Sequence, residues 1–340
     1  MNMILTKINN MNVEINKQYE LILAIHAVYL LKHPELKDDE FDFIETPNIK
    51  YMHDLEELIP IQNYPEMIKY ITNFTDCSVP INLAMIINDC YQIDYNKMQI
   101  KQINEWMRYG TIEGFTTELQ RIANEIHWDE FLKKYISFYQ NIVEKYCQFP
   151  TNLDLSDIER YYSVSPQTYT FIPSVLMNGG FGVSDYKKNL YYNYGIKYYD
   201  NIEDFYVNHE YLVECLFHEF SHPIVNSLVD KYLTNTNYLE KFYLKMVQNN
   251  LFKTYSKQPE TVMYEYLVRA NAYILTSKYF QENMPPIEDD WVIPYGFIYL
   301  PNLVYFTTEN LPKYKNYAEF VQKAIPEFIN ECTKQVKKSK

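Results

Sequence analysis

Two histidines and a glutamate at a fixed spacing form the segment of the chain best suited to chemistry. His218-Glu219-Phe220-Ser221-His222 follows the pattern H-E-x-x-H. Residues four apart on a helix project from the same face, so both imidazoles can bind one metal ion. Glu219 lies one step round from His218, where its carboxylate can take a proton from a water molecule activated by the metal. The pattern predicts one zinc ion per chain, with His218 and His222 as ligands and Glu219 as catalytic base.

Apolar residues flank the motif on both sides, so a helix over residues 209–232 is expected to be largely buried. A buried set of two histidines and a glutamate would be costly to leave without a partner. The alternative interpretation, two histidines in the core of a structural protein with a chance motif, predicts no bound metal.

A catalytic zinc usually has three protein ligands and one water. Glu265 is the favoured third ligand because it lies on a separate helix, over residues 259–280, whose apolar positions suit packing against the motif helix. Arg269 follows four residues later and is expected to hold that carboxylate in place, the alternative being a surface ion pair. The motif helix and its surroundings offer other candidate ligands: His209, Glu210, Glu214, Asp230 and Glu260.

Asn226 follows His222 by four residues and therefore lies on the metal-facing side of the helix. Its side chain is expected either to accept a hydrogen bond from an imidazole N–H or to cap local backbone, and both roles remain open.

The motif and the later glutamate resemble the gluzincin group of zinc peptidases, in which H-E-x-x-H is completed by a Glu on a downstream helix. His218–His222 with Val225-Asn226, then the segment 265–270, are more closely similar to an uncharacterised bacterial domain-of-unknown-function family grouped with zincin-like peptidases. The resemblance implies a metallopeptidase fold with His218, His222 and Glu265 as ligands. The interval from His222 to Glu265 is longer than in familiar gluzincins, and a helix over 238–249 is expected to fill it.

Zincins commonly hold an extended substrate along an edge strand. By that analogy Gly180, Phe181 and Gly182 are candidates for pairing with a peptide, although a hairpin turn or bulge is the favoured interpretation of this glycine-rich segment. Tyr295 is a candidate for stabilising a tetrahedral intermediate.

The remaining pattern predicts an α+β fold with helix in excess, zincin-like, with a small mixed or antiparallel sheet over the motif helix. Residues 1–150 are expected to be mainly helical, with a strand at 12–15 and helices at 18–32 and 129–146. Residues 151–340 form the expected catalytic region, with the sheet within 165–200, although one continuous domain is also possible. Residues 291–305 are expected to be strand or extended, and 317–334 a closing helix.

Composition excludes several classes of protein. The net charge of −13 repels nucleic acid and anionic membrane surfaces. Five widely spaced cysteines predict neither a disulfide framework nor a cysteine-based zinc site. No run is long and apolar enough to span a bilayer, and the first residues lack a signal-peptide pattern, which favours a cytoplasmic protein or one whose leader has been removed.

Two functions of different class follow. The first is a zinc metallopeptidase acting on a peptide or protein substrate. The second is a catalytically inactive zinc- or peptide-binding protein that kept the fold. Glu219 favours the first, since binding zinc does not require that carboxylate.

Overall fold

The computed structural model divides the chain into two compact units. Unit 1 comprises residues 1–148 and 167–207, and unit 2 comprises residues 149–166 and 208–340. The sequence-based division at residue 150 placed the strands of segment 165–200 with the C-terminal region, whereas they group with unit 1. The structure describes residues 3–36, 43–75, 78–97, 107–165, 168–185, 189–196, 209–234, 237–247, 258–280, 284, 286–287, 292 and 295–334.

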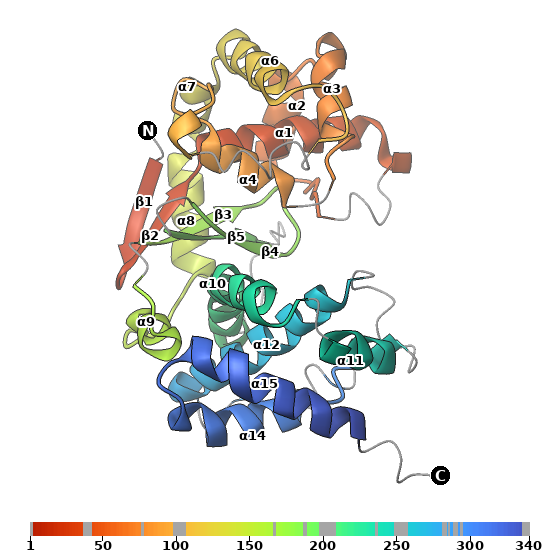
Figure 1. Cartoon of the computed structure of the whole chain (residues 1–340). Coiled ribbons are helices and arrows are strands. Elements are labelled where there is room, and N and C mark those ends of the chain that lie inside the picture. Colours follow the sequence, from red (N-terminus) through yellow and green to blue (C-terminus); the bar gives the residue numbers. More distant parts are fainter. Residues whose placement is uncertain are drawn as a thin grey trace. The chain divides into compact units, whose positions relative to one another are not determined.

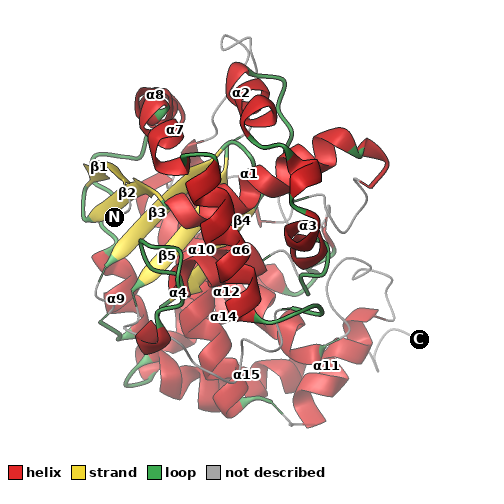
Figure 2. Ribbon diagram, turned by 90° about the horizontal axis from the view of Figure 1, so that it is seen from above, coloured by secondary structure: helices red, strands yellow, loops and turns green. Residues whose placement is uncertain are grey.

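A five-stranded mixed sheet lies within unit 1, in the order β1-β2-β3-β5-β4 (Figure 2). The outer pairs β1–β2 and β4–β5 are antiparallel, while β2–β3 and β3–β5 are parallel. The parallel pairing of β2 with β3 explains why the middle segment of the chain joins the N-terminal unit. The strands are β1 (Met3–Ile8), β2 (Met11–Ile15), β3 (Tyr169–Ser174), β4 (Gly180–Ser184) and β5 (Leu190–Gly195).

The glycine-rich segment forms a strand and not a turn. Gly180, Phe181 and Gly182 lie in β4, at the edge of the sheet, so the favoured interpretation as a hairpin turn or bulge was wrong for these residues. Gly179 supplies the left-handed backbone, with φ of 86°, immediately before the strand. Local glycine content suggested a turn, but the antiparallel pairing with β5 decided the outcome.

Helix α1 (Lys17–Lys32) forms the centre of the core of unit 1 and confirms the predicted helix at 18–32. Asn16 caps it by accepting a hydrogen bond from the backbone N–H of Tyr19 at 2.9 Å. Shorter 3-10 turns occur at Pro34–Leu36, Ile61–Asn63 and Tyr95–Lys97. The other helices described in the unit are α2 (Lys50–Leu58), α3 (Pro65–Ile71), α4 (Val79–Ile86), α6 (Ile112–Glu125), α7 (Trp128–Lys134) and α8 (Ile136–Tyr146).

The single helix expected over 129–146 is two helices, so this prediction was wrong. The break falls at Tyr135, with φ of −103° and ψ of 4°, outside helical values. The Tyr135 ring packs against the rings of Tyr51, Phe131 and Phe138. A continuous apolar pattern therefore spans a bend that tertiary packing of aromatic rings stabilises.

A buried carboxyl group joins α1 to its neighbours in unit 1. Glu20 is 1% exposed and accepts hydrogen bonds from the hydroxyls of Tyr51, at 2.9 Å, and of Tyr139. Burial raises the pKa of Glu20, and hydrogen bonds from Tyr139, Ser174 and Tyr51 oppose this without cancelling it.

The helices and strands described in unit 2 are all helices. Three predicted helices are confirmed in α10 (His209–Tyr232), α12 (Pro259–Phe280) and α15 (Tyr317–Lys334), and α10 and α12 lie side by side (Figure 1). The predicted helix at 238–249 corresponds to α11, although residues 248–249 lie outside the described ranges. The remaining elements are α9 (Ser156–Tyr162), α11 (Asn237–Val247), α14 (Leu300–Asn310) and a 3-10 turn at Leu311–Lys313.

The prediction of strand or extended chain at 291–305 was wrong for its C-terminal part. Residues 300–310 form α14, which begins with Pro301 in its first turn and buries Leu300, Leu303 and Thr307. These buried residues are three and four positions apart, which is helical spacing. The prediction of a strand had rested on the β-branched and aromatic residues of the segment. Residues 291, 293 and 294 lie outside the described part of the chain.

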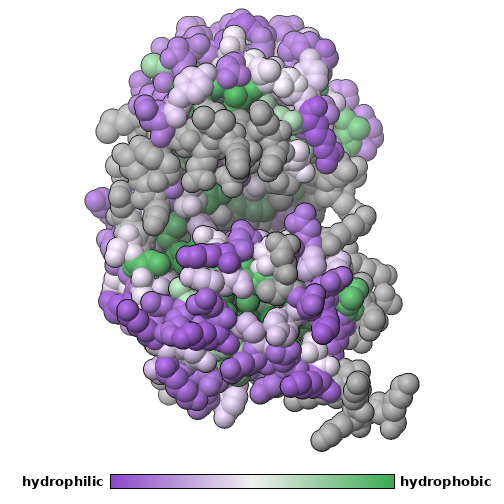
Figure 3. Space-filling model, in the orientation of Figure 1, coloured by the Kyte–Doolittle hydropathy of each residue, from purple (hydrophilic) through white to green (hydrophobic). Residues whose placement is uncertain are grey.

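The predicted class, α+β with helix in excess, is confirmed. The predicted placement of the sheet over the motif helix is a relation between the two units and stays a prediction. Among the described helices, none has the length and apolar character needed to cross a membrane. Hydrophilic residues cover most of the described surface of unit 2 on the face shown in Figure 3.

Candidate metal centre

Helix α10 carries the motif on a buried face. Val213, Leu216, Phe217 and Phe220 are fully buried around it, as the apolar flanks predicted. Pro223 follows the second histidine inside the helix and, lacking an N–H, removes one hydrogen bond from the helical ladder at this point. The polar motif residues are thus set into a helix otherwise built for packing.

Three side chains converge from α10 and α12. His218 Nε2 lies 3.0 Å from His222 Nε2, and Glu265 places Oε1 3.5 Å from His222 Nε2 and Oε2 3.8 Å from His218 Nε2. Their side chains are 12–17% exposed, so the group is sheltered but reachable by solvent. These are the three ligands predicted from the sequence.

The donor set fits zinc. Two imidazole nitrogens and one carboxylate oxygen form one of the common ligand sets of catalytic zinc sites, which keep a fourth position open. Tetrahedral ligands about 2.1 Å from one ion would lie roughly 3.4 Å apart. The three observed separations, from 3.0 to 3.8 Å, bracket that distance. The ligand atoms could therefore bind one ion with small side-chain adjustments.

The protonation state of His218 also suits metal binding. Burial, and then electrostatic interaction with Arg269 and His222, lower the pKa of His218 well below its usual 6.5. A neutral imidazole offers a nitrogen lone pair, which an imidazolium does not. His218 is consequently ready to act as a ligand at neutral pH.

Glu219 lies beside the three ligands without joining them. Its Oε1 is 3.9 Å from His218 Nε2, and its side chain is 14% exposed. A carboxylate at this distance is close enough to act on a water molecule next to the metal, as a general base must.

Arg269 holds Glu265, the predicted third ligand. Its Nη2 donates to Glu265 Oε2 at 2.7 Å, one turn away on α12, and its side chain is only 6% exposed. The guanidinium also stacks over the ring of Phe297 at 4.8 Å. The pair is buried, so the alternative of a surface ion pair was wrong. Phe297 was missed because no local pattern in the sequence connects it to Arg269.

Asn226 takes the first of its two predicted roles. Its Oδ1 lies 3.3 Å from His222 Nδ1, which places a hydrogen-bond acceptor at the ring nitrogen facing away from the ligand group. A proton on Nδ1 leaves Nε2 of His222 as the metal-facing lone pair.

The other candidates whose side chains the structure describes do not join the ligand group. Within the described residues, His218, His222 and Glu265 form the one group with metal-binding spacing. Glu214, Glu210, Asp230 and Glu260 are outside it, and Asp230 instead accepts a hydrogen bond from the hydroxyl of Tyr264. The side chain of His209 lies outside the described part of the chain. Glu210, Glu214 and Asp230 lie on α10 itself. A side chain further along the same straight helix cannot turn back to an ion that residues 218 and 222 already hold.

The predicted substrate-binding residues fall in separate units. Gly180, Phe181 and Gly182 form an edge strand, which is the geometry that peptide pairing needs, but they belong to unit 1. Tyr295 belongs to unit 2 and is 50% exposed. Their roles in binding a substrate stay predictions.

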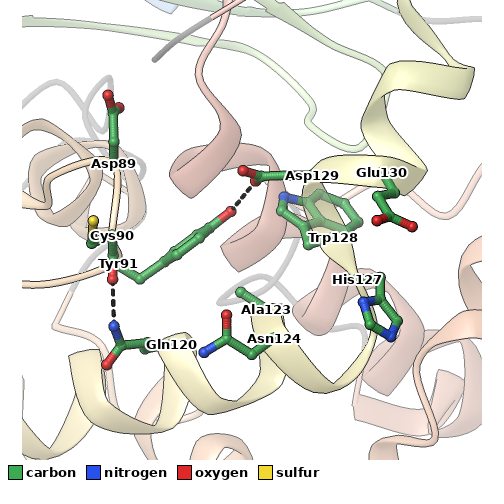
Figure 4. A pocket seen from close by; sticks show the side chains of 10 residues that line it. All are labelled: Asp89, Cys90, Tyr91, Gln120, Ala123, Asn124, His127, Trp128, Asp129 and Glu130. Atoms are coloured by element: carbon green, nitrogen blue, oxygen red, sulfur yellow. Dashed lines mark hydrogen bonds between the residues drawn. The ribbon is translucent and has the colours of Figure 1, made fainter.

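A hollow of about 400 Å³ lies in unit 1, between the segment 89–91, α6 and the start of α7 (Figure 4). Much of its polar lining is already paired. Tyr91 donates to Asp129 at 3.0 Å, Lys17 donates to the same carboxylate at 2.8 Å, and Gln120 donates to the carbonyl of Cys90. These bonds fasten the segment to α6 and α7, and they join α1 to α7.

Comparison with known proteins identifies a family but no activity. The family described as "Domain of unknown function (DUF4932)" matches residues 11–331, which is nearly the whole chain. No curated protein and no solved structure matches the chain.

Proposed function

The chain belongs to the DUF4932 family, and we propose that it is a zinc-dependent metallopeptidase that hydrolyses peptide bonds with His218, His222 and Glu265 as ligands. The observation that carries the proposal is the convergence of these three side chains from two helices, with Glu219 alongside. The resemblance to gluzincin peptidases supports the same ligand set. A buried histidine pair facing a carboxylate has no evident structural purpose that would also require Glu219.

Each residue has a defined task in this proposal. His218, His222 and Glu265 hold the ion, which when bound supplies Lewis acidity and brings the pKa of water down towards roughly 7. Glu219 accepts the proton of the attacking water and returns it to the leaving amine, so that the amine departs neutral. Arg269 and Asn226 fix the orientation of Glu265 and His222.

The second candidate is an inactive zinc- or peptide-binding protein. The ligand group would serve it equally well, but Glu219 would then be dispensable. The two candidates therefore predict different results for Glu219→Gln, which removes the charge of Glu219 and keeps its shape.

The test compares wild type with His218→Ala, Glu219→Gln and Glu210→Gln, after zinc is added and excess removed. Elemental analysis gives the zinc content, and mass spectrometry of a mixed peptide library gives cleavage. We expect about one zinc per wild-type chain, lost in His218→Ala and kept in Glu219→Gln. Cleavage is expected to fall by roughly 10²–10⁴ in Glu219→Gln. Glu210→Gln, the same change elsewhere on α10, is expected to alter neither.

Different failures have different meanings. Wild type without stoichiometric zinc would overturn the metal centre and the peptidase together. Zinc binding without cleavage of any peptide, or with equal cleavage in Glu219→Gln, would favour the binding protein.

A further inference from the structure

The three ligands come from two helices, so their spacing depends on how α10 and α12 are held together. His218 and His222 lie on α10, whereas Glu265 lies on α12. The buried faces of both helices are largely apolar, and apolar contacts are non-directional. A metal site needs its ligands placed to within a fraction of an ångström. Directional interactions, such as hydrogen bonds, are therefore needed to fix one helix against the other.

Helix α9 supplies directional contacts to both ligand helices through two consecutive tyrosines. Tyr162 donates its hydroxyl to Ser221 Oγ on α10 at 2.7 Å. Tyr161 donates its hydroxyl to Asn271 Oδ1 on α12 at 2.8 Å. Asn271 in turn donates to the hydroxyl of Tyr317 on α15 at 2.6 Å. One short helix is therefore bonded to both of the helices that carry ligands.

Both attachment points lie close to the ligands. Ser221 is the residue immediately before His222, and its hydroxyl donates a hydrogen bond of 2.5 Å to the carbonyl of Phe217, the residue immediately before His218. Asn271 lies less than two turns beyond Glu265 on α12. A shift at either point would be transmitted directly to a ligand.

The network is buried except for Tyr161, which is half-buried, and its hydroxyls are in the donating state. Ser221, Asn271 and Tyr317 are 0% exposed, and Tyr162 is 2% exposed. Burial raises the pKa of Tyr161, Tyr162 and Tyr317, so all three stay protonated. The three rings also pack edge to face or tilted, with centroids 4.8–5.7 Å apart. Buried, satisfied polar networks of this kind specify one arrangement of the groups that they join.

We infer that Tyr161 and Tyr162 are positioning residues that clamp α10 to α12 and so set the spacing of His218, His222 and Glu265. The inference rests on the proposed function, since it assumes that the three residues bind zinc. Sequence reasoning missed the clamp because Tyr161-Tyr162 is one pair among many tyrosines and lies far from the motif in the chain.

The test measures metal binding in Tyr162→Phe, which keeps the ring and removes the hydroxyl. Zinc affinity is measured by competition with a chromophoric chelator, and the visible spectrum of the cobalt(II)-substituted protein reports the ligand geometry. We expect zinc affinity to fall by about tenfold or more, the usual effect of removing an outer partner of a metal site. The cobalt spectrum is expected to change as well.

Tyr279→Phe is the matched control. Tyr279 also bonds α12 to α9, donating to Asp157 Oδ2 at 2.7 Å, but it lies about four turns beyond Glu265, roughly 20 Å along the helix. Each variant loses one tyrosine hydroxyl that bonds α9 to a ligand helix, α10 for Tyr162 and α12 for Tyr279. Both are therefore expected to lower the Tm of the metal-free protein. Only Tyr162→Phe is expected to alter zinc affinity and the cobalt spectrum.

Ser221→Ala keeps the inference falsifiable if Tyr162→Phe does not fold, because alanine favours the helix. It is expected to weaken zinc binding similarly, and the double variant is expected to bind no more weakly than the worse single one, since both remove the same bond. Wild-type zinc affinity and cobalt spectrum in Tyr162→Phe, or in Ser221→Ala, would overturn the clamp alone. A wild type that binds neither metal would overturn the metal centre and, with it, the clamp.

Discussion

Arg269 donates to Glu265 at 2.7 Å across one turn of α12, and the same Glu265 oxygen lies 3.8 Å from His218. One carboxylate thus faces a guanidinium on one side and two imidazoles on the other. Without a metal, the guanidinium is the compensating charge for the buried carboxylate. The pair therefore contributes to stability as well as to the proposed metal centre.

Arg269→Met is expected to destabilise the metal-free protein by about 3–5 kcal/mol, because it leaves a buried carboxylate without its partner. Added zinc is expected to recover part of that loss, since the ion replaces the missing positive charge. Thermal unfolding with and without zinc measures both. The control is Lys323→Met, which breaks an exposed i,i+4 pair with Glu319 and is expected to lower the stability far less, because solvent screens that pair. Equal losses in the two variants would contradict the role of Arg269.

Glu265→Ala and Glu214→Ala separate the third ligand from its nearest rival in the sequence. Glu265→Ala is expected to reduce zinc retention after dialysis to well below one per chain, because two histidines alone hold the ion weakly. Glu214→Ala is expected to retain about one zinc per chain. Both are measured by elemental analysis, and the reverse result would move the third ligand to Glu214.

Asn226→Ala is expected to weaken zinc binding by about tenfold, because His222 loses the acceptor that fixes its ring and its tautomer. Asn226→Asp restores an acceptor oxygen at the same place and is expected to bind at least as tightly as wild type. Chelator competition measures the affinities. An Asn226→Ala variant that binds as wild type would show that the 3.3 Å contact does not orient the ring.

Glu20→Gln tests the buried carboxyl of unit 1 through pH. Burial raises the folded-state pKa of Glu20 above its usual 4.5, so the protonated form is favoured by folding. The stability that this contributes is complete below about pH 4.5 and is lost as the pH rises through the folded-state pKa. Glutamine resembles the protonated carboxyl and does not titrate. The Tm of Glu20→Gln relative to wild type is therefore expected to increase from acid towards neutral pH and then level off, and a difference that stays flat would contradict a raised pKa.

Gly195→Ala is expected to destabilise unit 1 by at least about 1–3 kcal/mol, as other insertions into tight packing do. A Cβ at this position would lie 2.1 Å from the carbonyl oxygen of Met177, which is backbone and cannot move aside cheaply. Gly179→Ala is the comparison, because a Cβ there meets no atom within 4 Å and costs only the left-handed backbone strain, about 1–2 kcal/mol. Denaturant unfolding measures both, and a tolerated alanine at 195 would contradict the close approach.

The amino-acid sequence determined those features that depend on local spacing. The four-residue interval of His218 and His222 fixes a shared helix face, and the long apolar periodicities predicted α10, α12 and α15 to their ends. Glu265 and Arg269 could be paired in advance because they too lie one helical turn apart. Where apolar periodicity continued through a bend, as at Tyr135, the same reasoning failed.

Contacts between distant segments were decided only by the tertiary structure. The parallel pairing of β2 with β3 moved the middle strands into the N-terminal unit, and antiparallel pairing with β5 made Gly180–Ser184 an edge strand. Tyr162 bonds to Ser221, and Arg269 packs on Phe297, although each pair is far apart in the chain. No local pattern in the sequence links the two members of either pair. Local spacing is a property of a helix or strand by itself, whereas such partners are selected by packing of the whole unit, which one sequence does not encode in any short pattern.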